Sequence, residues 1–122
     1  MDKDRKEIIK YCDEAIETIL EDMEFENEVI DRYKIEAYEL TKKFFRERYD
    51  NNLRHYGGDK KRMDNYLLDR DIQYFRVYSE GLYSLSLEDN MKTKVISKEL
   101  KNISNVIFTD LDIYTGTPNF RF

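Results

Sequence analysis

The first 56 residues contain neither glycine nor proline, and this absence constrains the fold more than any other feature of the sequence. Apolar side chains recur there at steps of three and four residues, the spacing of one face of an α-helix. One apolar stripe runs from Ile8 to Met23 and a second from Val29 to Phe45. We predict two amphipathic helices with a break in residues 24–27. One continuous helix is the alternative, because only Glu26 interrupts the apolar phase.

The glycine pair Gly57-Gly58 is expected to end the second helix. Asp59 can cap a third helix, whose apolar side reaches Tyr78 and which Gly81 is expected to end. Beyond Gly81 the period of the pattern changes to two, which is typical of strands. The strand-like segments are Tyr83–Leu87, Met91–Val95 and Val106–Thr109, and a turn at Asp89-Asn90 separates the first two. Ile96, Leu100 and Ile103 fit a short helix between the second and third segments. A turn at 115–118 precedes the tail 119–122.

These patterns predict an α+β fold that is predominantly α-helical. Two or three amphipathic N-terminal helices would be followed by a small C-terminal antiparallel β element. The length suits a single domain over residues 1–122, with a helical part at 1–81 and a β-containing part at 82–122.

Several classes of protein are disfavoured by the composition. Cys12 is the only cysteine, which excludes an internal disulfide and a thiolate metal cluster. No stretch approaches the roughly 18 apolar residues of a membrane span, and the N-terminus lacks the apolar run of a signal peptide. We therefore expect a cytoplasmic protein with no metal, no cofactor and no membrane association. The excess of Ile, Lys, Asn and Tyr over Ala, Gly and Pro indicates an AT-rich genome, such as that of a low-GC bacterial host or its phage.

Charge is distributed unevenly along the chain. Residues 1–40 contain 14 acidic and 6 basic side chains, whereas residues 41–76 contain 6 acidic and 10 basic ones. Residues 13–31 hold nine acids and no base. Their acids either form a solvated face paired with Lys42, Lys43, Arg46 or Arg48, or present an acidic surface to a basic partner. The predicted partner-binding residues are Asp13, Glu17, Glu21, Asp22, Glu24, Glu28 and Asp31.

A basic cluster after the second helix has the opposite character. Arg54, Lys60, Lys61 and Arg62 could contact phosphates, or could simply begin a polar helix. The net charge of −5 argues against direct nucleic-acid binding, which usually requires a net basic face. Ten tyrosines offer further binding groups, and Tyr49, Tyr56 and Tyr83 are candidate aromatic anchors near predicted element ends.

No catalytic constellation is recognisable. His55 is the sole histidine, and Cys12 lies on an apolar stripe, where a buried structural thiol is expected. The run Asp110-Leu111-Asp112 has the paired aspartates of haloacid-dehalogenase-type phosphatases, but Tyr114 stands where that motif requires threonine. We therefore predict that the chain is not an enzyme.

In size, acidity and lack of catalytic residues, the chain resembles small accessory proteins that act by binding. Immunity proteins of bacterial toxins and phage-encoded inhibitors such as anti-CRISPRs belong to this class. The leading hypothesis is a non-catalytic inhibitor whose acidic helix binds a basic, nucleic-acid-handling protein. The alternatives are a nucleic-acid-binding accessory protein that uses the basic 54–62 segment, and a self-assembling subunit whose long helices pair with a second copy as a homodimer.

Overall fold

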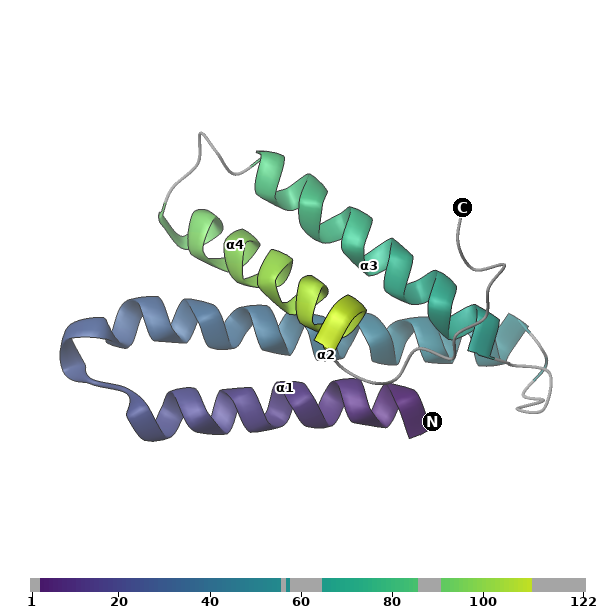
Figure 1. The fold of residues 1–122 in the computed structure, drawn as a ribbon, viewed down its shortest axis with the longest axis horizontal. Helices are drawn as coiled ribbons and strands as arrows, with labels where there is room; N and C mark the ends of the chain where they lie inside the picture. Colours follow the sequence, from purple (N-terminus) through teal and green to yellow (C-terminus); the bar gives the residue numbers. More distant parts are fainter. Residues whose placement is uncertain (1–2, 56, 58–64, 86–90, 111–122) are drawn as a thin grey trace.

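The computed structural model describes residues 3–55, 57, 65–85 and 91–110, which form two antiparallel helical pairs packed across each other (Figure 1). The elements in chain order are α1 (Lys3–Asp22), the short 3₁₀ helix η1 (Phe25–Asn27), α2 (Glu28–His55), α3 (Asn65–Leu85), α4 (Met91–Asn105) and the π-helical turn η4 (Val106–Asp110).

The long helices α1 and α2 lie antiparallel to each other (Figure 1). The predicted break between them is confirmed, because Glu24 has an extended backbone and the Asn27 amide donates to its carbonyl at 3.0 Å. Charge favours a break here. Acidic side chains oppose the dipole at the end of a helix and stabilise its start, and Glu28 and Asp31 occupy the first turn of α2. One continuous helix is therefore excluded.

The core lies where the apolar stripes of the helices meet. Ile8 and Cys12 of α1 are fully buried, as is Phe45 of α2. Phe75 of α3 packs against Phe45 with ring centroids 5.3 Å apart. α4 and η4 also contribute side chains to the core: the buried residues Leu100, Ile103 and Ile107 recur there at helical spacing.

The prediction of a C-terminal β element is wrong. No strand is present in residues 65–85 or 91–110: Tyr83–Leu85 continue α3, Met91–Val95 begin α4, and Val106–Asp110 form η4. The alternation that suggested strands spans only about five residues at a time. A helical stripe from Ser97 through Leu100 to Ile107 is longer and buries more apolar surface, so packing against α2 and α3 overrides the weak β preference. The described fold is a helical bundle.

Other expectations fall outside the described residues. The Asp59 cap, the turn at Asp89-Asn90, the turn at 115–118 and the tail 119–122 all lie there. Among the helices that are described, none combines the length and the apolar character required to cross a membrane.

Gly81 does not end α3 as predicted, because the helix continues to Leu85. Nothing lies within 4 Å of a Cβ built on Gly81, so alanine fits there. We expect Gly81→Ala to raise the free energy of unfolding by about 0.5–1 kcal/mol, the difference in helix propensity between the two residues. Urea denaturation followed by circular dichroism measures this change.

The matched control is Gly57→Ala. Gly57 follows α2 with φ of 63°, and its amide donates to the Arg54 carbonyl at 3.0 Å. A side chain in this left-handed conformation should destabilise the protein by about 1 kcal/mol. Destabilisation by Gly81→Ala as well would contradict an uninterrupted α3.

Candidate partner-binding surface

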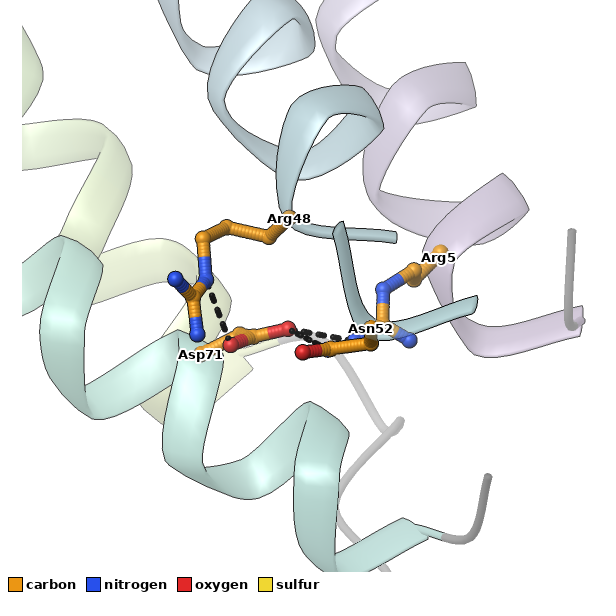
Figure 2. A network of polar contacts seen from close by, with 4 residues as sticks. All are labelled: Arg5, Arg48, Asn52 and Asp71. Atoms are coloured by element: carbon orange, nitrogen blue, oxygen red, sulfur yellow. Dashed lines mark hydrogen bonds and ion pairs between the residues drawn. The ribbon is translucent and has the colours of Figure 1, made fainter. Parts of the chain in front are cut away.

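The densest polar cluster in the described structure is a buried network centred on Asp71 of α3 (Figure 2). Arg5 of α1 donates to Asp71 Oδ2 through Nη2 at 2.5 Å. From α2, Arg48 donates to Oδ1 through Nε at 2.9 Å, and Asn52 donates to Oδ2 through Nδ2 at 3.0 Å. One carboxylate therefore accepts hydrogen bonds from two neighbouring helices.

This network is structural, because its central groups are sealed from solvent. The side chains of Asp71 and Arg5 are 0% and 2% exposed, so neither can reach a dissolved substrate. Both arginines also make cation–π contacts. The Cζ of Arg5 lies 5.7 Å from the centroid of the Tyr49 ring, and the Cζ of Arg48 lies 5.2 Å from the centroid of the Tyr74 ring.

Tyr49, a candidate aromatic anchor, is only 8% exposed. It therefore packs within the fold beside Arg5. Tyr56 lies outside the described residues, and Tyr83 lies in the last turns of α3, where only the backbone is described.

Sequence reasoning missed the role of Asp71. A signal was present, because Asp71 precedes Phe75 by four residues and so lies on the apolar side of the predicted third helix. An acidic residue in that register needs a buried cation, and arginine is the side chain best suited to meet a carboxylate there.

The thiol of Cys12 is also sealed in the core. Burial, followed by the negative charge of Asp13, raises the pKa of Cys12 from 9.0 to about 12. The thiol is therefore protonated at neutral pH and cannot act as a nucleophile in this conformation. Within the described residues, no group of three or more His, Cys, Asp or Glu side chains is arranged to hold a metal ion.

The basic segment is only partly described. Arg54 is exposed at the end of α2 and donates to the side-chain oxygen of Asn51. Lys60, Lys61 and Arg62 lie outside the described residues.

Apart from Asp13, which lies in the middle of α1, the predicted acidic residues gather at one end of the molecule. They occupy the end of α1, the turn and the start of α2, and this turn lies farther out than the ends of α3 and α4 (Figure 1). Three acids of the 13–31 run form ion pairs: Asp13 with Lys42 at 2.6 Å, Glu14 with Lys10 at 3.9 Å and Glu28 with Arg32 at 3.0 Å.

The remaining six acids of the run have no cation within 4 Å in the described part of the chain; they are Glu17, Glu21, Asp22, Glu24, Glu26 and Asp31. Three of the four basic residues of α2 that could have neutralised them contact other acids, and the fourth, Arg46, lines a separate pocket together with Glu17. Lys42 binds Asp13, Lys43 binds Glu47 and Arg48 binds Asp71. We call residues 17–31 the acidic tip.

A groove of about 600 Å³ extends between α1 and α2 from Asp22 and Asp31 in the acidic tip to Tyr11 and Tyr38 nearer the middle of the two helices. Its charged lining residues are the acids Glu14, Asp22, Asp31 and Glu99 and one base, Lys34. Tyr38 donates to Glu99 Oε2 at 3.4 Å. Burial, followed by a hydrogen bond with Tyr11 and by nearby negative charge, raises the pKa of Tyr38 well above its ordinary value of 10. The hydroxyl therefore stays neutral, and the negative charge of the groove comes from its carboxylates.

The comparisons with known proteins identify no relative: no family model, no curated protein and no solved structure matches this chain.

We expect Asp71→Ala to lower the free energy of unfolding by about 3–5 kcal/mol, because it removes the acceptor shared by the buried Arg5 and Asn52 and the partly buried Arg48. The control is Glu80→Ala, which removes an exposed ion pair with Arg76 and should change stability by no more than about 0.5 kcal/mol. Chemical denaturation measures both. Equal effects would show that the Asp71 network does not hold the helices together.

We expect Cys12 to resist alkylation in the folded protein. A pKa of about 12 instead of 9.0 lowers its thiolate fraction at pH 8 by roughly 1000-fold relative to the unfolded chain. Iodoacetamide labelling followed by mass spectrometry, with and without urea, tests this. Above about pH 9 only the thiol of the unfolded chain ionises, so the free energy of unfolding falls as the pH rises. Rapid labelling without urea would contradict the burial of Cys12.

Proposed function

We propose that this protein is a non-catalytic binding protein that presents its acidic tip to a basic surface of a protein partner. The observation that supports this proposal is the set of six carboxylates at the end of the α1–α2 hairpin without a cation in the described structure. Carboxylates used only for solubility would be expected to alternate with lysines, as they do elsewhere on the surface.

The clustering has a cost in the free protein. Glu17 and Glu21 are one helical turn apart on α1, and like charges at that spacing destabilise a helix by a few tenths of a kcal/mol. A basic partner would relieve this repulsion on binding. The same field would speed the encounter with that partner and weaken as salt is added.

Partners with a strongly basic surface include proteins that handle nucleic acids, because their binding grooves neutralise phosphates. Carboxylates projecting from a helical hairpin could occupy such a groove and exclude the nucleic acid. The proposed activity is therefore inhibition by occupation, as in phage-encoded inhibitors such as anti-CRISPRs or in toxin immunity proteins.

The test is neutralisation of the tip by Glu17→Gln, Glu21→Gln, Glu24→Gln and Glu26→Gln together. These side chains are exposed, so the variant should fold with unchanged or slightly increased stability. We expect it to lose basic proteins that the unaltered chain captures from a bacterial lysate at 0.1 M NaCl. Quantitative mass spectrometry of the captured proteins measures the loss.

A matched control carries the same change in net charge at exposed sites away from the tip: Glu7→Gln, Glu39→Gln, Glu47→Gln and Glu80→Gln. We expect this control to capture the same proteins as the unaltered chain. Equal capture by all three proteins would refute the proposal, and so would capture that does not weaken at 0.5 M NaCl.

A further inference from the structure

The acidic tip also carries an unusual amount of exposed apolar surface. Phe25 in η1 is 92% exposed, and Leu20 and Val29 on the adjoining helices are 52% and 55% exposed. Together with Ile30, which is 37% exposed, we call these residues the apolar tip cluster, after their place in the sequence. It contains four of the nine large apolar or aromatic side chains that are exposed in the described structure, within eleven residues of sequence.

The fold gives no reason for Phe25 to be phenylalanine. It is not part of the buried core cluster or of the partly buried shell around it. It also lies at the turn of the hairpin, beyond the ends of α3 and α4 (Figure 1). An aromatic ring held almost entirely in water gains none of the free energy of burial, and phenylalanine is among the aromatic residues that are enriched in protein interfaces.

Charge specifies what can cover the cluster. Glu24 and Glu26 flank Phe25 in the sequence, and Glu21 lies one residue beyond Leu20; all three are exposed. An anionic membrane would be repelled by these carboxylates, although it could accept the ring. Nucleic acid would be repelled as well. A protein surface that combines an apolar socket with a lysine or arginine border matches both features.

We propose that Phe25 is the apolar anchor of the binding surface, inserting into an apolar socket on a partner protein while the acids around it meet basic side chains at the rim. This inference rests on the proposed function and deepens it. The expected partner is therefore amphipathic as well as basic. The charges would steer and select this partner, and the Phe25 ring would add affinity that salt does not remove.

The probe is a labelled synthetic 15-residue peptide of leucine and lysine, with the leucines at helical spacing along one face. A second peptide of equal charge has serine in place of every leucine. Fluorescence anisotropy at 0.1 M NaCl measures their binding to the full chain. We expect the leucine–lysine peptide to bind more tightly, and Phe25→Ser to weaken that binding about 30-fold, the size of effect that marks a hot spot.

The matched control is Val77→Ser, which removes a side chain that is 67% exposed on α3, away from the tip. It should leave binding of both peptides unchanged. Phe25→Ser should leave the weak binding of the serine–lysine peptide unchanged, because only charge holds that peptide. Thermal unfolding should show that both variants are folded, because neither residue belongs to the core.

The outcomes separate this inference from the proposed function. If the four-glutamine tip variant weakens both peptides but Phe25→Ser weakens neither, charge-based binding stands and the apolar anchor is refuted. If the tip variant has no effect on either peptide, the proposed function fails. Three other results would also refute the apolar anchor. They are an equal loss of peptide affinity from Phe25→Ser and Val77→Ser, no binding of the leucine–lysine peptide, and sedimentation with phosphatidylglycerol vesicles that depends on Phe25.

Discussion

The carboxylate of Asp71 is fully buried at the junction of α1, α2 and α3, where it accepts hydrogen bonds from Arg5, Arg48 and Asn52. A buried charge is costly unless its partners surround it, so these helices can pack closely only in the register that brings the four side chains together. The network lies at the end of α1 opposite to the tip, close to the first turn of that helix. It therefore fixes the base of the hairpin and leaves the far end free to project.

Core and surface are divided cleanly along the α1–α2 hairpin. Ile8, Cys12 and Phe45 are buried in the core. On α2, three basic side chains form ion pairs with acidic residues away from the tip; they are Lys42, Lys43 and Arg48. At the tip Glu28 still pairs with Arg32, but the other carboxylates have no cation partner in the described structure, and exposed apolar side chains such as Phe25 lie in the same segment. The combination is unfavourable for an isolated protein, but it suits a surface that is covered by an amphipathic basic partner.

Sequence reasoning succeeded where one strong period ran uninterrupted. The helices from Ile8 to Met23 and from Val29 to Phe45 were predicted with the break between them, because no glycine or proline competes there. It failed where the pattern was short. Five-residue alternations around Tyr83 and Met91 predicted strands, but a helix buries Leu100 and Ile107 together on one side, and that packing prevails. It also offered Tyr49 as a candidate aromatic anchor, although this residue packs beside the buried Arg5, which comes from a distant segment.

The sequence by itself determined the two long helices, the burial of Cys12 and the presence of a base-free acidic run, since these depend on local spacing and composition. Only the tertiary structure decided that Asp13 is neutralised, because its ion pair with Lys42 joins residues 29 positions apart. The same is true of Asp71, whose partner Arg5 lies 66 positions away. Local patterns set which face of a helix is apolar, but the packing of helices decides which charges find distant partners and which remain exposed.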